Sequence, residues 1–373
     1  MRLTRPFGVA IAAFLLELGS AGVWADDPAV GPDPQVYAQT VSKAVEYLKS
    51  AQAADGSYSK QTGPAVTALV TTGLLRHGRT VTDPQVSNAL KFLEGYVKPD
   101  GGIYDGDLYR NYETCLAMVC FAEANKDGRY NRVLANAEKY VKGLQWDSDD
   151  GHDLSSPSFG GAGYGRNKRP DLSNTSFMLD ALKSIGNGPD DPAIQRALVF
   201  VSRCQNLESP ENTTPFPAKN PDGGFYYTPA AGGVSQAGNT EQGGLRSYAS
   251  MTYAGLKSMI FAGLGPDDPR VKAAFEWARK HYDLTTNPGM GSSGLYYYYH
   301  TFAKALATMQ VDTFEDAAGV KHDWRRELVQ ELAKRQQPNG SWTNTESDRW
   351  LEGDPNLVTG YALLTLSYCR PGK

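Results

Sequence analysis

A short glycine-containing turn that ends in an aromatic residue recurs along this chain, and it constrains the fold more than any other feature. An amphipathic stretch with helical spacing precedes each turn, and a more apolar stretch follows it. Asp-Gly and Asn-Gly favour such turns because glycine adopts positive φ without steric cost. The six turns lie at 55–58, 100–104, 160–164, 222–226, 294–296 and 339–342.

The stretches that follow the turns predict buried helices. They are apolar or small on most sides, as at 65–75, 114–122, 251–264 and 357–366, and a helix that is apolar on most sides must be buried. Six such hairpins predict an all-α fold, the (α/α)6 toroid, with an inner barrel of buried helices and an outer layer of amphipathic ones. An open solenoid is the alternative, although polar capping repeats are not evident at either end.

The N-terminus has the pattern of a secretory signal peptide. Arg2 and Arg5 precede an apolar stretch, and small residues lead to Ala25. We expect cleavage there, export to the periplasm or the medium, and a single toroid domain over 26–373, with an uncleaved anchor as the alternative. No later apolar run is long enough to span a membrane. The balance of 37 Lys+Arg against 41 Asp+Glu argues against a nucleic-acid partner.

The cysteines do not suggest a disulfide framework. Four of them are spread over 373 residues without a CxxC pair, and all lie in apolar, helix-like stretches. We predict buried free thiols. The residues are Cys115, Cys120, Cys204 and Cys369.

The repeat resembles the QW repeat of squalene and oxidosqualene cyclases. The segment 43–58 carries its Lys-Ala, Tyr-Leu, Gln and Gly positions and ends in Tyr58 instead of Trp, whereas 336–342 keeps the final Trp. The segments 137–145 and 196–205 match its first half. The chain therefore resembles an exported, bacterial-type member of the prenyltransferase and squalene-cyclase repeat superfamily, and this resemblance implies the α/α toroid.

The catalytic residues of that superfamily are mostly missing. Class II cyclases protonate an alkene with the central Asp of a DxDDTA motif. Residues 147–150 read Asp-Ser-Asp-Asp but fall in a connecting loop, so we predict a solvated acidic loop or a weak calcium site there. The equivalent helix start, 171–176, keeps Asp171 but has Ser173 and Asn174 in place of carboxylates. Of the zinc ligands of protein prenyltransferases, the resemblance leaves only His300, so neither a metal nor a cofactor is expected.

The starts of the inner helices supply the candidate site residues. Parallel inner helices bring their N-termini to one mouth, where their partial positive charges favour an anionic group. The predicted catalytic residues are Asp171, His300, Tyr299 and Arg246, and the predicted substrate-binding residues are Arg110, Asn111, Glu113, Arg166, Asn174, Tyr248, Tyr296, Trp350 and Asp354.

Two kinds of enzyme fit these residues, and both take a small-molecule or glycan ligand in the central cavity. An isoprenoid could be bound or transformed between aromatic walls formed by 296–299, Tyr248, Tyr253 and Phe177. The alternative is a secreted polysaccharide lyase or hydrolase, with Tyr or His300 as base and Arg246 or Asn111 stabilising charge on a uronate. A binding module without catalysis is the third possibility. An apolar, enclosed cavity favours the isoprenoid, and an open polar groove contradicts it.

Overall fold

Twelve α-helices form nearly all of the regular structure in the computed structural model, which describes residues 30–165 and 168–372. The predicted signal peptide (1–25) and the candidate residue Arg166 lie outside the described residues. Within the described chain, no helix is long and apolar enough to cross a membrane.

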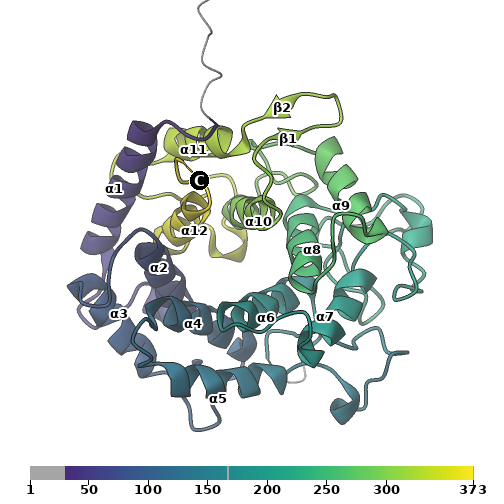
Figure 1. Ribbon diagram of the computed structural model, residues 1–373, viewed down its shortest axis with the longest axis horizontal. Coiled ribbons are helices and arrows are strands. Elements are labelled where there is room, and N and C mark those ends of the chain that lie inside the picture. Colours follow the sequence, from purple (N-terminus) through teal and green to yellow (C-terminus); the bar gives the residue numbers. More distant parts are fainter. Residues whose placement is uncertain (1–29, 166–167, 373) are drawn as a thin grey trace, which may run out of the picture.

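The odd-numbered helices form the outer layer (Figure 1). Several begin at an Asp-Pro pair. Asp33, Asp191 and Asp268 accept hydrogen bonds from backbone N–H groups of the first turn, and Pro occupies the position that needs no donor. These helices are α1 (Pro34–Ala51), α3 (Pro84–Glu94), α5 (Asn131–Lys142), α7 (Pro192–Arg203), α9 (Pro269–Lys280) and α11 (Trp324–Arg335).

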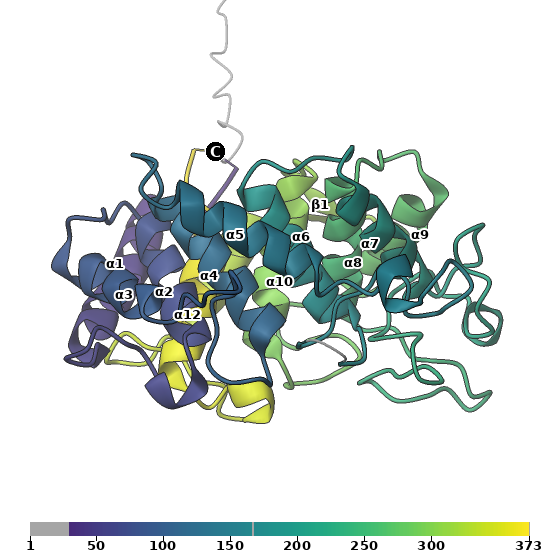
Figure 2. The same cartoon turned by 90° about the horizontal axis from the view of Figure 1, so that it is seen from below.

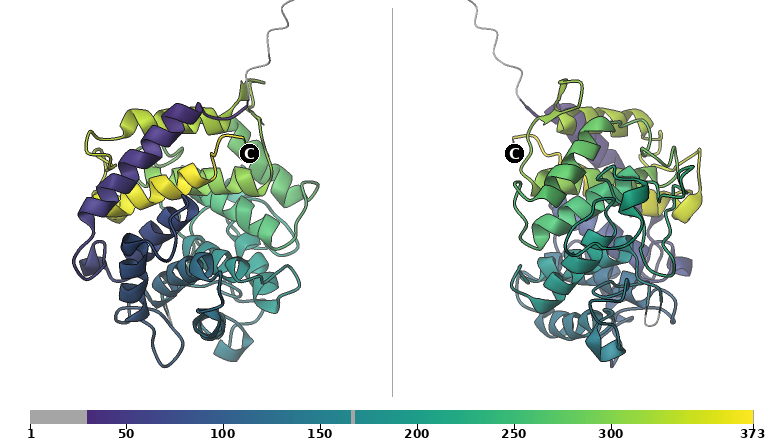
Figure 3. Two further views of the ribbon diagram at one scale, coloured as in Figure 1. Left: turned by 60° about the vertical axis from the view of Figure 1, so that its left-hand side comes forward. Right: turned by 90° about the vertical axis from the view of Figure 1, so that its right-hand side faces the viewer.

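The even-numbered helices form a closed inner ring. Each packs against the next one around the barrel, and α12 packs against both α2 and α1, so the two ends of the chain meet (Figure 3). This closure confirms the all-α toroid and excludes the open solenoid. The inner helices are α2 (Ala65–Arg76), α4 (Arg110–Ala124), α6 (Leu172–Ser184), α8 (Ala249–Phe261), α10 (Leu295–Thr308) and α12 (Pro355–Ser367).

Little other regular structure is present in the described residues. Strand β1 (Phe314–Glu315) pairs antiparallel with β2 (Lys321–His322), with Phe314 opposite His322. Four short 3₁₀ helices lie in the connections: η1 (Lys60–Thr62), η2 (Ser148–Asp150), η3 (Pro217–Lys219) and η4 (Arg349–Leu351).

A glutamine at the end of an outer helix ties neighbouring repeats together. The Nε2 atom of Gln52 donates to the Gly56 carbonyl in its own turn, at 3.0 Å, and to the Gln85 carbonyl in α3, at 2.8 Å. Gln145 and Gln205 make the same pair of bonds in their repeats. Gln336 closes the ring, because its Nε2 donates to Gly340 and to Thr40 of α1, both at 2.9 Å.

A threonine one turn into an inner helix fixes the other side of the turn. The Thr359 hydroxyl accepts a hydrogen bond from the backbone N–H of Trp342 at 3.1 Å. The same bond recurs in four other repeats, from Tyr58 to Thr67, Ile103 to Thr114, Ala162 to Thr175 and Phe225 to Thr252.

The deep part of the barrel contains a buried ion cluster. Asp180 of α6 contacts two lysines, with Oδ1 at 2.6 Å from Lys257 Nζ and Oδ2 at 2.7 Å from Lys304 Nζ. Lys257 also donates to the Ser176 hydroxyl at 2.7 Å. The cluster holds three inner helices together. The four cysteines are buried and unpaired, as predicted.

Candidate functional site

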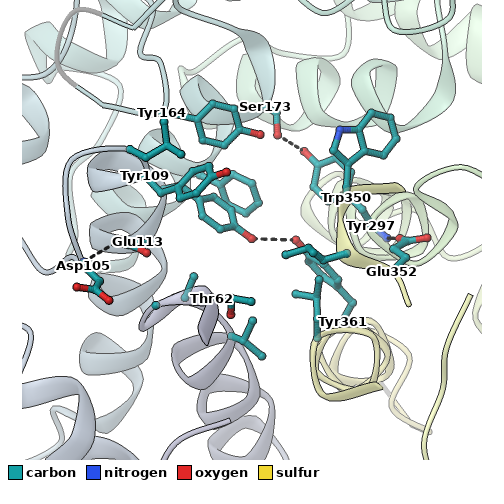
Figure 4. A pocket seen from close by; sticks show the side chains of 18 of the residues that line it. Thr62, Asp105, Tyr109, Glu113, Tyr164, Ser173, Tyr297, Trp350, Glu352 and Tyr361 are labelled. Atoms are coloured by element: carbon teal, nitrogen blue, oxygen red, sulfur yellow. Dashed lines mark hydrogen bonds between the residues drawn. The ribbon is translucent and has the colours of Figure 1, made fainter. Parts of the chain in front are cut away.

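A cavity of about 640 Å³ opens at the end of the barrel where the inner helices begin (Figure 4). All six inner helices contribute lining residues from their first two turns, together with the long connections that project at this end (Figure 2). Its aromatic lining residues are Tyr109, Tyr112, Tyr164, Phe177, Tyr227, Tyr248, Tyr297, Trp350 and Tyr361.

Four of these aromatic residues form a collar around the cavity. Tyr112 packs edge-on against Phe177, with ring centroids 5.0 Å apart, and Phe177 contacts Tyr297 at 6.0 Å. Tyr297 contacts Tyr361 at 5.9 Å, and the hydroxyls of Tyr361 and Tyr112 lie 3.4 Å apart (Figure 4). We call Tyr112, Phe177, Tyr297 and Tyr361 the aromatic collar. Their edge-to-face and tilted rings present π faces and hydroxyl edges from four different helices.

Glu113 is a buried acid that lines the cavity. It stands in the first turn of α4 and is 2% exposed. Its Oε2 accepts a hydrogen bond from the backbone N–H of Asp105 at 2.7 Å. Burial, together with the nearby Asp105 carboxylate, raises the pKa of Glu113 to about 7. Gly63 leaves the space that Glu113 Oε1 occupies, because a side chain at position 63 would collide with that atom.

Carboxylates also occupy the starts of three more inner helices. Asp171 caps α6 by accepting from Asn174 N at 2.9 Å, and burial raises the pKa of Asp171 to about 6. Asp354 caps α12. Glu352 accepts from the backbone N–H groups of Tyr296 and Tyr297 at 2.8 and 2.9 Å. The helix starts therefore offer an anionic ligand less positive potential than parallel dipoles alone predict.

The predicted polar residues at the mouth are held by other partners. Arg110 forms an ion pair with Asp107 and lies over the Tyr104 ring. Arg246 is exposed and donates to the Asn239 carbonyl at 2.8 Å. Asn111 donates to the Gly163 carbonyl at 3.0 Å, and Asn174 Nδ2 donates to Asp171 at 2.8 Å. None of these four side chains lines the cavity.

The tyrosine run of α10 divides between faces of the helix. Tyr297 points into the cavity, but Tyr296 and Tyr299 contact each other and do not line it, contrary to the prediction. Tyr299 donates instead to the Leu284 carbonyl at 2.6 Å. The reason is helical periodicity: residues three apart share a face, and α10 begins at Leu295, so one tyrosine faces inward.

His300 lies deeper than the cavity. It follows Tyr297 by about one turn, its ring contacts Tyr361 at 5.8 Å, and it is not a lining residue. Burial and the nearby Lys304 ammonium lower the pKa of His300 well below its ordinary value. His300 is therefore placed in the barrel interior, behind the collar, and not at the mouth.

Exposed apolar side chains form the rim of the cavity on two sides. Leu108 and Tyr109 precede α4, and Trp350 and Leu351 belong to η4; all four line the mouth and remain exposed. Trp350 and Leu351 have φ values of 57° and 64°. Left-handed backbone in residues with bulky side chains stores strain and is frequent at ligand clamps.

Several lining residues were not predicted from sequence. Phe177, Tyr248 and Tyr297 were predicted as walls and Glu113 and Trp350 as binding residues, but Asp105, Tyr112, Tyr361 and Glu352 were not named as site residues. A tyrosine in an otherwise apolar inner helix was the available signal for Tyr112 and Tyr361. The loop carboxylates carried no such signal, because their placement depends on how the connections fold back over the mouth.

Two further sequence predictions concern the acidic segment 147–150 and a metal site. Asp147 pairs with Arg196 of α7 at 3.4 Å and is not a lining residue. Among residues 30–165 and 168–372, no group of three or more His, Cys, Asp or Glu side chains is arranged to hold a metal ion.

Solved structures with the same overall fold come from enzymes with different chemistry. The chain is similar to the type II terpene cyclase MstE from Scytonema, with a TM-score of 0.51 and 14% identity over 90% of this chain and 98% of that one. It is also similar to a polysaccharide lyase, with a TM-score of 0.53 and 13% identity over 89% of this chain and 96% of that one. A glycosyl hydrolase of family 88 from Bacteroides vulgatus gives a TM-score of 0.53 and 10% identity over 90% of this chain and 98% of that one.

These similarities establish the α/α toroid fold and leave the reaction open, because one fold carries many functions. No protein-family model matches the chain, and no curated protein matches it by sequence.

Proposed function

We propose that the cavity binds a mainly apolar ligand of the isoprenoid class and that Glu113 acts on it as a general acid. The observation that carries the proposal is the aromatic collar beside the buried carboxyl group of Glu113. Its π faces suit both a branched hydrocarbon chain and a cation that develops on it. A volume of about 640 Å³ lies in the range of small-molecule pockets.

Glu113 has the properties that an acid catalyst needs. A carboxyl group whose pKa is about 7 holds a proton in a large fraction of molecules near neutral pH. Its proton would pass to an alkene carbon, the π electrons would form the new C–H bond, and the cation on the adjacent carbon would face the collar. Loss of a proton to water would then complete an isomerisation or cyclisation without a co-substrate.

A lyase acting on uronates receives less support from the lining. Such an enzyme needs a cationic or strongly donating group at the substrate carboxylate and a base beside it. The described lining residues include no Lys, Arg or His side chain, and His300, Arg246 and Asn111 are not among them. The mouth carries carboxylates instead, which repel a uronate.

The test compares binding and turnover in one preparation. Wild-type protein is incubated with geranylgeraniol and with squalene, binding is measured by titration calorimetry, and extracted products are analysed by mass spectrometry. Glu113→Gln should still bind these ligands but form no product, whereas the surface control Glu46→Gln should match wild type. Release of unsaturated product from a uronate polymer, with no binding of either isoprenoid, would contradict the proposal.

A further inference from the structure

The described charged residues that line the cavity are all acidic. They are Asp105, Asp107, Glu113 and Glu352. Asp107 is paired with Arg110, and Glu352 is bound by backbone N–H groups of α10. Asp105 is exposed at the mouth, and Glu113 stands beside it. The part of this charge that faces a ligand therefore comes from Asp105 and Glu113.

The Oε1 atom of Glu113 has no hydrogen-bond partner among the described residues. Glu113 is only 2% exposed, and its Oε2 accepts a hydrogen bond from the backbone N–H of Asp105. No hydrogen bond to Oε1 is formed by residues 30–165 or 168–372, although Glu113 lines the cavity. Oε1 can therefore accept a hydrogen bond from a ligand or from water in the cavity.

The cationic side chains around the mouth are turned to other partners. Arg349 donates to Gln236 Oε1 at 2.6 Å and lies over the Trp350 ring. Arg169 lies behind Tyr227, with its guanidinium carbon 5.7 Å from the ring centroid. Arg110 and Arg246 are held as described above. Together with the carboxylates at four inner-helix starts, these contacts direct the described arginines of the mouth away from an anionic ligand.

Aromatic faces complete the mouth on the side of the acidic pair. Tyr109 packs against Tyr164 at 5.3 Å, and Tyr164 contacts Tyr112 at 6.3 Å, so the collar continues outward to the rim (Figure 4). Aromatic faces next to carboxylates are the arrangement that holds ammonium groups, because both the ring quadrupole and the anion attract a positive charge.

We propose that the mouth selects ligands by the charge of the polar head: a protonated amine or quaternary ammonium is held most strongly, an uncharged hydroxyl less, and a diphosphate or carboxylate is rejected. Asp105 and Glu113 are the specificity-determining carboxyls, and Tyr109 and Tyr164 supply the aromatic faces. The inference rests on the proposed function only for the apolar body of the ligand.

Titration calorimetry with matched head groups tests the selectivity. One series is geranylamine, geraniol and geranyl diphosphate, and the second is decylamine, decanol and decyl phosphate, all below micelle-forming concentrations and near neutral pH. We expect the amine to bind more tightly than the alcohol, and the diphosphate or phosphate at least about tenfold more weakly than the alcohol, since like charges repel.

A matched pair of variants separates the mouth from general surface charge. Asp105→Asn should weaken amine binding by about two- to fivefold, as for a partly exposed charge pair, and weaken alcohol binding by a smaller factor. Asp267→Asn, an exposed site in the turn between α8 and α9, should change neither.

Each outcome decides the matter. Equal or tighter binding of the phosphorylated ligands, or an Asp105→Asn variant with unaltered amine binding, overturns the selectivity. If the decyl series keeps the order while the geranyl series does not bind, the isoprenoid proposal fails and the selectivity stands. If neither series binds, both are wrong.

Discussion

At the scale of single residues, Glu113 connects stability to pH. Its folded pKa of about 7 lies above the ordinary value of 4.5, so between these values the folded chain binds more protons than the unfolded one. The stability that this proton contributes is fully present below about pH 4.5 and is lost as the pH rises through about pH 7. The groups that act on Glu113 are Asp105, which raises its pKa, and Lys98, which lowers it.

The first prediction follows from the raised pKa of Glu113, which makes the protein less stable as the pH rises. Glu113→Gln, which cannot ionise, should lose less stability than wild type over that interval, by an amount of the order of 2 kcal/mol. Urea unfolding at both ends of the interval measures the difference, with Glu46→Gln as the control. A variant whose pH dependence equals that of wild type would show that Glu113 ionises freely in the folded protein.

The second residue-scale prediction concerns Asp180. Asp180→Asn leaves the ammonium groups of Lys257 and Lys304 in the barrel without a counter-charge, and we expect a loss of about 3–5 kcal/mol. Asp180→Leu combined with Lys257→Met and Lys304→Met should lose much less, because it removes the buried charges together. Denaturant unfolding measures both. Equal losses would mean that the cluster stabilises the barrel by packing and not through its charges.

At this scale the sequence predicted only some of the residues that line the cavity. Glu113, Tyr248 and Trp350 line the cavity because they stand at or just before helix starts, and their part in substrate binding stays a prediction. Tyr299 and His300 were misplaced because the start of α10 at Leu295 sets which residues face inward, and that boundary was not clear from the tyrosine run.

At the scale of elements, four of the six turns are each held by one glutamine and one threonine. The third prediction is that Gln336→Ala costs about 1–3 kcal/mol, because two buried carbonyls at the ring closure lose their donor. Gln39→Ala, an exposed site in α1, should cost no more than about 0.5 kcal/mol. Thermal unfolding of both variants tests the difference. Similar melting temperatures would show that the ring closes without this bond.

The rim helix η4 gives a fourth prediction that separates binding from stability. Trp350→Gly relieves left-handed backbone strain, so the free energy of unfolding should stay the same or rise by about 1 kcal/mol. Isoprenoid binding should weaken at least about threefold, because an apolar wall of the cavity is lost. Ala231→Gly relieves similar strain away from the cavity and should not alter binding. Calorimetry and denaturant unfolding measure the two effects. Unchanged affinity in Trp350→Gly would remove the rim from the binding site.

The helices could be predicted from the repeat, but not all of the bonds that join them. Gln52, Gln145 and Gln205 could be predicted because each stands at the same distance after an aromatic-aliphatic pair at the end of an outer helix. The threonines were not recognised, because a single Thr in an apolar helix does not reveal whether its hydroxyl bonds its own helix or a neighbouring turn.

At the scale of the whole molecule, closure of the ring is what creates a cavity. Six parallel inner helices bring lining residues that are far apart in sequence, such as Tyr112 and Tyr361, to one mouth. The repeat made this arrangement predictable, because hairpins with one buried helix each must share a core. The ligand was not predictable in the same way, since it depends on which side chains project past the collar.

A crystal structure with geranylgeraniol present tests the central claim most directly. We predict density for the apolar chain inside the barrel mouth, against Tyr112, Phe177, Tyr297 and Tyr361, with the hydroxyl toward Asp105 and Glu113. A cavity that stays without ligand at saturating concentration, or a ligand bound outside the collar, would contradict the account.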